Sequence, residues 1–415
     1  MEKDSLEKNL CAPSTMEVEL PTHTLKNSKT KSTLSNDLVG KKIAVVHEWL
    51  STNAGSESVT KHIVKLVDKA DIFATVEFMS NADRKSIAGD RKIHTSFIQW
   101  LPFARRHFRY YLPIFPIAVR SHNLKKYDVI ISSSHAFAHG IRKRKSQIQI
   151  CYCHTPMRYI WDMKDIYLES HGINSGVIGW ASKLLTDILR LWDARVSKNV
   201  DFYIANSTFT AQRIRRFYGR KAEVIFPPVN VNKYQVEEDK EDFYITVSRL
   251  VCYKKVDLVV DAFTKMPDKK LIVIGDGNEK DKIQSSAGEN ITFLSHLEFE
   301  KFHYYMRKAK AFVFAGKEDF GITLVEAQAC GTPLIAFHKG GAAEIVKHGK
   351  TGVLFKKQNI EAITNAVEVF EKDFNGSFSA KEIRENANRF STDSFNEHFS
   401  NYVKQCVAEK HGDQI

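Results

Sequence analysis

The sequence predicts an α/β protein of two doubly wound domains, each a parallel sheet covered by helices on both faces. The chain has 415 residues, of which 43% are hydrophobic. A chain of this length is usually too long to fold around a single hydrophobic core. Strand-like apolar runs alternate with helical segments, as in parallel sheets. The alternation stops once, at Pro227 and Pro228, and then resumes. This composition excludes a wholly disordered chain, a collagen-like chain and a minidomain that depends on disulfides.

The first domain is expected over residues 41–228. Residues 1–40 are rich in Ser, Thr, Asn and Lys without an apolar period, so we expect them to form a disordered tail. The run KKIAVVHEWL, which begins at Lys41, predicts a buried strand, and SESVTKHIVKLV predicts the helix that follows it. Further strands are expected at Tyr127–Ser132, Ile148–Cys151 and Phe202–Ala205.

The second domain is expected over residues 229–392, with the charged run EEDKED in the linker. Its strands are expected in YITVSRL, KLIVIGDG, ITFLSHL, AFVFAG and PLIAFH, with helices at 256–265, 279–287, 298–308 and 322–330. Residues 393–415 are expected to form a C-terminal helix and tail. Because ligands bind beyond the carboxyl ends of strands in open α/β sheets, we expect both domains to present loops to a central cleft.

The positive charge is concentrated in one part of the first domain. Of a formal net charge of +12, residues 97–160 supply eleven Lys or Arg and one acid. Aromatic residues are interspersed there with Arg105, Arg106 and Arg109, which predicts contact with an anionic membrane surface or a phosphate-bearing acceptor. A solvated basic face is the alternative. Because these arginines also interrupt the most apolar stretch, we expect no membrane-spanning helix.

The cysteines indicate neither disulfides nor a metal site. The six cysteines include no C-x-x-C pair, and no secretory leader is recognisable, so we expect reduced thiols in a cytosol. Cys151, Cys153 and His154 lie together but lack a second pair of ligands, so we expect no metal.

The segment KEDFGITLVEAQACGTPLIAF predicts the main binding site. A strand ends before it and a helix begins at its glycine, so the N–H groups of Gly321, Ile322 and Thr323 should point out of a helix N-terminus and bind an anion. Glu318 lies before that turn and Glu326 about one turn inside the helix. Carboxylates in these places can accept hydrogen bonds from sugar hydroxyls.

A second cluster follows another strand of the same domain. In SRLVCYKKVD, Arg249 and Lys254 can converge on one diphosphate, Arg as a planar fork and Lys as a point charge. Such cations would stabilise the negative charge of a departing nucleoside diphosphate. Two surface cations without a ligand are the alternative. Gly275 and Gly277 follow the next strand and would permit a close approach of backbone to the ligand.

His154 is the candidate in the first domain. It follows a strand in CYCHTPMRYIWD, where the carboxyl end of that strand should open onto the cleft. A core histidine packed beneath aromatic residues is the alternative.

Four segments resemble one family. EDFGITLVEAQACGTPLIAF resembles the E-x7-E signature of family 4 retaining glycosyltransferases, and SRLVCYKKVDLVVDAF resembles their phosphate-gripping Arg/Lys segment. HEWLSTNAGSE and CYCHTPMRYIWD are similar to bacterial O-antigen and exopolysaccharide mannosyltransferases of that family. The resemblance covers residues 41–400. It departs where the usual Gly-Gly pair is Ala54-Gly55 and where the usual Pro is Cys252, and neither departure removes a charged group.

This resemblance implies a GT-B arrangement of two Rossmann-like domains that transfers a sugar with retention and without a catalytic metal or other cofactor. By position, it assigns the ribose hydroxyls to Glu326, the transferred sugar to Glu318, the diphosphate to Arg249 and Lys254, the opposite wall of the sugar site to His154, and the acceptor or phosphate loop to Gly55.

The resemblance therefore implies a cytoplasmic enzyme, peripheral on the inner face of a bacterial plasma membrane. It would move a hexose, mannose from GDP-mannose, onto a lipid-linked saccharide for surface polysaccharide. The alternatives are a UDP-sugar donor, a phosphorylase of a soluble glycan, an inactive scaffold and a basic nucleic-acid-binding protein. Since the sequence contains no RRM signature, zinc knuckle or helix-turn-helix pattern, we expect no nucleic-acid partner.

Overall fold

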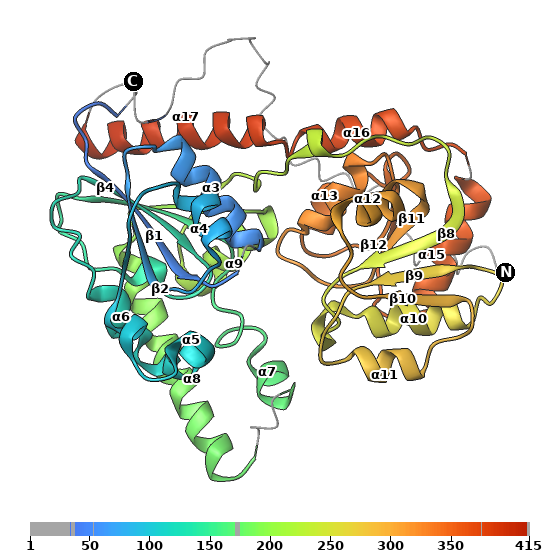
Figure 1. The fold of residues 1–415 in the computed structure, drawn as a ribbon, viewed down its shortest axis with the longest axis horizontal. Coiled ribbons are helices and arrows are strands. Elements are labelled where there is room, and N and C mark those ends of the chain that lie inside the picture. The colour runs from blue at the N-terminus through green and yellow to red at the C-terminus, as the bar shows by residue number, and fades with distance from the viewer. Residues whose placement is uncertain (1–33, 35–37, 53, 171–174, 375, 413–415) are drawn as a thin grey trace. The chain divides into compact units, whose positions relative to one another are not determined.

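The computed structural model describes residues 34, 38–52, 54–170, 175–374 and 376–412. These residues form two compact units (Figure 1). The N-terminal unit runs to Pro228 and takes in the last helix of the chain, and the C-terminal unit spans Val229–Ser391. Most of the expected tail, residues 1–40, lies outside the described residues. Leu34 and Leu38 are described, and both are buried in the core of the N-terminal unit, so folded structure begins before Lys41.

A seven-stranded sheet of parallel strands, in the order β3-β2-β1-β4-β5-β6-β7, forms the centre of the N-terminal unit. Its strands are β1 (Ile43–Leu50), β2 (Asp71–Glu77), β3 (Ile93–Thr95), β4 (Val129–Ser134), β5 (Ile148–Cys153), β6 (Phe202–Ala205) and β7 (Glu223–Val224). The α-helices are α3 (Gly55–Leu66), α4 (Asn81–Ala88), α5 (Ala104–His107), α6 (Phe115–Arg120), α7 (Lys164–Ser170), α8 (Gly176–Val196) and α9 (Thr208–Tyr218).

Each face of this sheet packs on its own apolar cluster. Successive side chains of a strand point to opposite faces. Accordingly, Ile43 and Val45 of β1 pack in one cluster, whereas Ala44 and Val46 pack in the other. Burial on both faces explains why β1 reads as a continuous apolar run.

The C-terminal unit is a six-stranded parallel sheet in the order β10-β9-β8-β11-β12-β13. Its strands are β8 (Glu241–Val247), β9 (Leu271–Ile274), β10 (Ile291–Leu294), β11 (Ala309–Phe314), β12 (Leu334–Phe337) and β13 (Gly352–Phe355). The helices are α10 (Val256–Thr264), α11 (Lys280–Ser285), α12 (Phe299–Lys308), α13 (Ile322–Ala329), α14 (Ala342–Ile345), α15 (Ile360–Asp373) and α16 (Ala380–Asn388).

The last helix, α17 (Thr392–His411), belongs to the N-terminal unit. Its residues Phe395, Phe399, Val403 and Cys406 are buried in the same cluster as Ile43 and Val45 of β1. Figure 1 shows α17 in red beside α3, with which it makes contact. The chain thus returns from the C-terminal unit to complete the core of the N-terminal one.

Candidate functional site

The centre of the C-terminal sheet is a topological switch point. Strand β8 pairs with β9 on one side and with β11 on the other. In doubly wound sheets, ligands bind beyond the carboxyl ends of the strands at such a point. The segments that leave β8 and β11 there carry Arg249 and Lys254 on one side and Glu318 on the other.

Lys254 and Glu318 form an ion pair between these two segments. Their side chains are 15% and 24% exposed, so both are largely shielded yet remain open to solvent. The backbone of the two segments also meets, since a Cβ on Gly316 would lie 2.9 Å from the carbonyl oxygen of Lys254. Residues from the two predicted motifs therefore lie together.

The guanidinium of Arg249 is held by a hydrogen bond to Tyr253, four residues further along the chain. Its Nη2 donates a hydrogen bond of 2.6 Å to the hydroxyl of Tyr253, and the Arg249 side chain lies at the surface. Tyr253 is a residue that the sequence did not single out. By holding one edge of the guanidinium, it limits the positions that the cation can take.

Helix α13 begins directly after the Glu318 segment. Its N-cap is Gly321, whose φ of 102° lies in the left-handed region that favours glycine. The first turn of a helix has no intrahelical acceptors for its N–H groups, so those of Ile322 and Thr323 point out of the N-terminus. The helix dipole adds partial positive charge there, which makes this end suitable for an anion.

A glycine pair after β12 fixes the backbone of the Glu318 segment. Gly341 donates its N–H to the carbonyl oxygen of Glu318 at 3.0 Å. A Cβ on Gly341 would lie 1.9 Å from the carbonyl oxygen of Phe320, and one on Gly340 would lie 2.1 Å from that of Glu318. These positions admit no larger residue unless the segment moves.

Glu326 lies inside α13, where Tyr234 donates a 2.7 Å hydrogen bond to its Oε1. Burial raises the pKa of Glu326 above its usual range, and the Tyr234 hydrogen bond and the charge of Lys233 oppose that shift. The sequence did not single out Tyr234, because it precedes Glu326 by 92 residues. This hydrogen bond thus holds the carboxylate in one orientation.

Gly275 and Gly277 are explained by neighbouring backbone. A Cβ on Gly275 would lie 1.9 Å from the carbonyl oxygen of Ser248, and one on Gly277 would lie 2.2 Å from that of Leu250. We expected these glycines to allow backbone to approach a ligand. The structure shows that the segment after β8 approaches them instead, and contact with a ligand stays a prediction.

In the N-terminal unit, His154 is buried beyond the end of β5. Its Nε2 lies 2.8 Å from the hydroxyl oxygen of Ser133, and its ring centroid lies 5.1 Å from that of Tyr152. Burial, together with the charges of His135 and His47, lowers the pKa of His154 to about 3. His154 is therefore neutral near pH 7, and its packing beside Tyr152 agrees with the core-histidine alternative as well as with a site role.

A buried polar network continues from His154 to β1. The hydroxyl of Thr60 lies 2.8 Å from that of Ser133 and 3.1 Å from Nδ1 of His47. The His47 ring lies between two carboxylates: Nδ1 is 3.8 Å from Oε2 of Glu48, and Nε2 is 3.9 Å from Oε1 of Glu57. In the sequence, His47 and Glu48 stood out only as part of the segment HEWLSTNAGSE, which resembles the glycosyltransferase family. Their spacing does not show that they meet Thr60 and Ser133.

The network carries charge in a desolvated place. Burial would lower the pKa of His47, but the hydrogen bond and charge of Glu57 and the charge of Glu48 outweigh burial and raise it. Burial would likewise raise the pKa of Glu48, but the charges of His135 and His47 and two backbone N–H groups hold it at about 2. The pKa of Glu57 is also about 2, because its interactions with His47 outweigh burial.

His47, Glu48 and His135 also offer ligand atoms within 4.8 Å of one another, a spacing that a metal ion could use. However, Nδ1 of His47 lies 3.0 Å from the carbonyl oxygen of Ser133, which can only accept, so this nitrogen carries a proton. Oε1 of Glu48 accepts from the backbone N–H groups of His135, Ala136 and Ala138. The ion pairs of Glu48 with His47 and His135, at 3.8 and 3.2 Å, thus explain why the three residues lie close together.

The remaining predicted residues lie elsewhere in the N-terminal unit. Gly55 is the first residue of α3, and Ala54 before it has an extended backbone with φ of −113°, so the missing glycine causes no strain. Arg105, Arg106 and Arg109 are exposed on α5 and the 3₁₀ turn that follows it. Among the described residues, no carboxylate lies within ion-pair distance of these three arginines.

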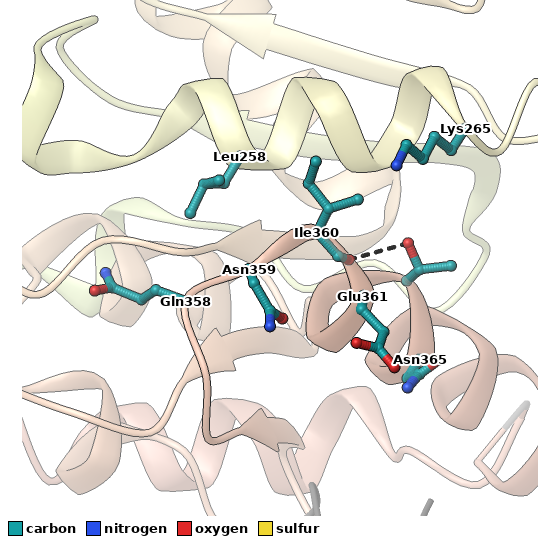
Figure 2. Close-up of a pocket in the computed structure, with 8 residues that line it drawn as sticks. Leu258, Lys265, Gln358, Asn359, Ile360, Glu361 and Asn365 are labelled. Atoms are coloured by element: carbon teal, nitrogen blue, oxygen red, sulfur yellow. Dashed lines mark hydrogen bonds between the residues drawn. The ribbon is translucent and has the colours of Figure 1, made fainter.

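A cavity of about 480 Å³ lies at the surface between α10 and the start of α15 (Figure 2). Leu258, Lys265 and Gln358 line it, and the hydroxyl of Thr364 donates to the carbonyl oxygen of Ile360 at its edge. None of the predicted site residues lines this cavity, so we do not place the site there.

Two family models match consecutive parts of the chain. Residues 54–233 match Glycosyltransferase Family 4, and residues 230–390 match Glycosyl transferases group 1.

Two curated relatives illustrate the similarity. The chain is 26% identical over 233 residues to a GDP-mannose-dependent alpha-(1-6)-phosphatidylinositol monomannoside mannosyltransferase of Mycolicibacterium smegmatis, covering 49% of this chain and 59% of the relative. It is 32% identical over 136 residues to an N-acetyl-alpha-D-glucosaminyl L-malate synthase of Bacillus anthracis, covering 29% and 34%. The matches thus span only part of each relative.

Solved structures share the fold. HepE of Anabaena in complex with UDP and glucose is 18% identical with a TM-score of 0.64, covering 88% of this chain and 99% of HepE. Sucrose-phosphate synthase of Thermosynechococcus elongatus is 16% identical with a TM-score of 0.66, covering 88% and 100%. These likenesses confirm the expected fold of two Rossmann-like domains of the GT-B type.

Proposed function

Because the chain belongs to the family 4 glycosyltransferases with the GT-B fold, we propose that it transfers a hexose from a nucleotide sugar to an acceptor hydroxyl with retention of configuration. The observation that carries the proposal is the ion pair of Lys254 with Glu318 at the switch point of the C-terminal sheet. A cation for a diphosphate and a carboxylate for a sugar lie side by side there.

The donor would lie across this point. Arg249, Lys254 and the N-terminus of α13 would bind the diphosphate and stabilise its growing charge as it leaves. Glu318 would accept hydrogen bonds from the hexose, and Glu326 from the ribose. Donor binding would then replace the Lys254–Glu318 contact, at least in part, by contacts to phosphate and sugar.

The transfer would be a front-face displacement. The bond from C1 of the sugar to the diphosphate oxygen breaks, and a bond from the acceptor oxygen to C1 forms on the same face. The hydroxyl proton passes to a phosphate oxygen of the leaving nucleoside diphosphate. The roles of His154, beside the sugar, and of Gly55, near the acceptor or phosphate, belong to this proposal.

We propose GDP-mannose as the donor, without a metal ion. The relative from Mycolicibacterium smegmatis is a GDP-mannose-dependent mannosyltransferase, which supports this choice. A UDP-sugar is the second candidate, because the HepE structures contain UDP. We propose a lipid-linked saccharide of surface polysaccharide as the acceptor and the inner face of a bacterial plasma membrane as the place of action.

Release of nucleoside diphosphate tests the donor. The purified chain would be given GDP-mannose, UDP-glucose, UDP-galactose or UDP-N-acetylglucosamine, each with and without chelator. We expect release from GDP-mannose alone, unchanged by chelator. Preference for a UDP-sugar would overturn the mannosyl assignment, and loss of release with chelator would overturn the metal-free one. Calorimetric titration with each donor separates a missing acceptor from a site that binds nothing.

A further inference from the structure

Helix α8 carries an apolar stripe on its exposed side. Val177, Trp180, Leu184, Ile188 and Leu191 are all exposed, Trp180 at 68% and Leu191 at 73%. Their spacing of three, four, four and three residues places them along one side of the helix. Along the 21 residues of the helix, this side carries more apolar residues than charged ones.

The opposite side of α8 is already packed. Leu185, Leu189 and Trp192 lie in an apolar cluster of the N-terminal unit. Asp193, on the same side, accepts a 2.7 Å hydrogen bond from Trp161 and lies 2.9 Å from Nε2 of His139. These contacts fix the rotation of the helix, so the stripe cannot turn into the core. A helix that is apolar on both sides is expected to have a partner on each.

A basic and aromatic segment, residues 97–120, packs on the same apolar cluster as α8. The ring of Phe137 contacts Phe115 of α6 at 5.3 Å and Trp192 of α8 at 5.6 Å, so one residue joins the two elements. The segment contains four arginines and no acid. Trp100 and Phe103 project from it with 85% and 81% exposure.

Phe103 is held in an unusual conformation. Its φ of 56° lies in the left-handed region, which is rare and strained for a bulky residue. The strain places a large apolar side chain in solvent beside Arg105 and Arg106. Strained backbone conformations of this kind cluster at functional sites.

We propose that the exposed stripe of α8 and the segment 97–120 form one docking surface for an anionic lipid bilayer. The stripe would enter the boundary between headgroups and acyl chains, and the arginines would bind lipid phosphates. No helix in the described ranges is long and apolar enough to cross a membrane, so α8 would lie in the plane of the interface. This goes beyond the proposed transfer reaction because it assigns a role to α8.

A second copy of the chain is a poorer occupant. A twofold interface places the same patch of both copies together. Both copies would then bring Arg105, Arg106 and Arg109 into the same interface, and like charges at an interface repel. A bilayer with anionic lipids supplies the opposite charge and an apolar interior together.

Vesicle flotation tests the surface without requiring activity. We expect the chain to float with vesicles of phosphatidylcholine and phosphatidylglycerol and to float far less with phosphatidylcholine alone. The triple variant W180S/L184S/L191S should bind at least tenfold more weakly. The variant R105S/R106S/R109S should lose on the order of tenfold or more, together with the dependence on salt. The control V236S/Y304S removes exposed apolar side chains of the C-terminal unit and should bind as the original does.

A second measurement uses the unmodified chain. Phosphatidylcholine and phosphatidylglycerol with brominated acyl chains should quench its tryptophan fluorescence, and Trp180→Phe should reduce the quenching. Unchanged flotation of the α8 variant, or no flotation of the original chain, would overturn the proposal. So would a concentration-dependent dimer that the α8 variant abolishes in sedimentation, since it would assign the stripe to a second copy. None of these outcomes depends on glycosyl transfer.

Discussion

Individual side chains in both units are held by partners that lie far away in the sequence. Lys254 meets Glu318, Tyr234 holds Glu326, and Nδ1 of His47 lies 3.0 Å from the carbonyl oxygen of Ser133. The charged members of the C-terminal site could be predicted, because phosphate and sugar chemistry restricts the residue types that serve. Their tyrosine partners could not, since a tyrosine that donates one hydrogen bond has no sequence pattern of its own.

Tyr234→Phe should weaken donor binding about tenfold, the usual loss for a hydrogen bond to a charged group. The phenylalanine keeps the ring but leaves Oε1 of Glu326 without its donor, which raises the pKa of Glu326 further. Calorimetric titration with GDP-mannose measures the loss. Tyr304→Phe, a matched change at a half-exposed residue that donates to Glu241, serves as the control. Equal affinity in both variants would mean that Tyr234 does not orient Glu326.

Glu57→Gln should reduce the free energy of unfolding by about 3 kcal/mol, because it leaves a buried charge on His47 without one partner. The pH dependence follows from the same groups. Glu48 and Glu57 have folded pKa values of about 2, below their usual 4.5, so their contribution is complete above pH 4.5 and is lost as the pH falls towards 2. The pKa of His47 is raised, so its contribution is complete below 6.5 and is lost as the pH rises through the folded value.

The cluster therefore stabilises the fold most between about pH 4.5 and 6.5. Denaturant unfolding of the original chain and of Glu57→Gln across pH 2.5 to 8 measures this. The difference between them should shrink at the acid end of the range. Glu368→Gln, at an exposed position of α15, should change little at any pH. A pH-independent difference for Glu57→Gln would contradict the ion pairs.

Helices, and the segments that carry the site residues, are positioned by contacts with residues of other parts of the chain. The Gly340-Gly341 pair after β12 supports the segment before α13, and the segment after β8 fills the space at Gly275 and Gly277. Long apolar strands such as β1 and β11 could be predicted because burial on both faces leaves a continuous apolar run. Strands β3 and β7 could not, since three and two residues carry no period. Strand β2 begins and ends with an acidic residue, which hides its buried centre.

Gly341→Ala should disturb the site more than the same substitution at a glycine that has open space around it. Gly341 has an ordinary φ of −63°, so its constraint is the 1.9 Å approach to the carbonyl of Phe320. We expect loss of about 3 kcal/mol in stability and loss of donor binding, because the Glu318 segment must move. Gly219→Ala provides the control: its φ is +65° but nothing lies within 4 Å, so about 1 kcal/mol is expected there. Thermal unfolding and donor titration measure both, and equal effects would contradict the steric argument.

At the scale of the whole molecule, the part of the chain that the structure describes passes from one unit to the other twice. Val229 and Ser391, where it enters and leaves the C-terminal unit, pair in a parallel bridge, and α17 then packs on the N-terminal core. The sequence predicted two domains from length and from the interruption at Pro227 and Pro228. It did not predict where α17 packs. The apolar pattern of a helix shows which side is buried, but not which part of the protein that side packs against.

Phe399→Ala should destabilise the N-terminal unit by about 4 kcal/mol, since this fully buried ring leaves a cavity. Hydrogen exchange should show faster opening of β1 and β5 and little change in β8 to β13. Phe374→Ala serves as the control: its partly buried ring packs on the C-terminal core, so it should speed exchange in the C-terminal unit instead. Faster exchange in the C-terminal sheet of Phe399→Ala would contradict the assignment of α17.

Lys254→Met shows whether the cation and the carboxylate that meet at the switch point hold and activate a nucleotide sugar. Nucleotide release from GDP-mannose would be measured for the original chain, for Lys254→Met and for Lys282→Met, whose lysine is 80% exposed on α11. We predict loss of at least a hundredfold for Lys254→Met, about the effect of removing one transition-state donor, with folding and Lys282→Met unchanged. Release by Lys254→Met at the original rate would contradict the account.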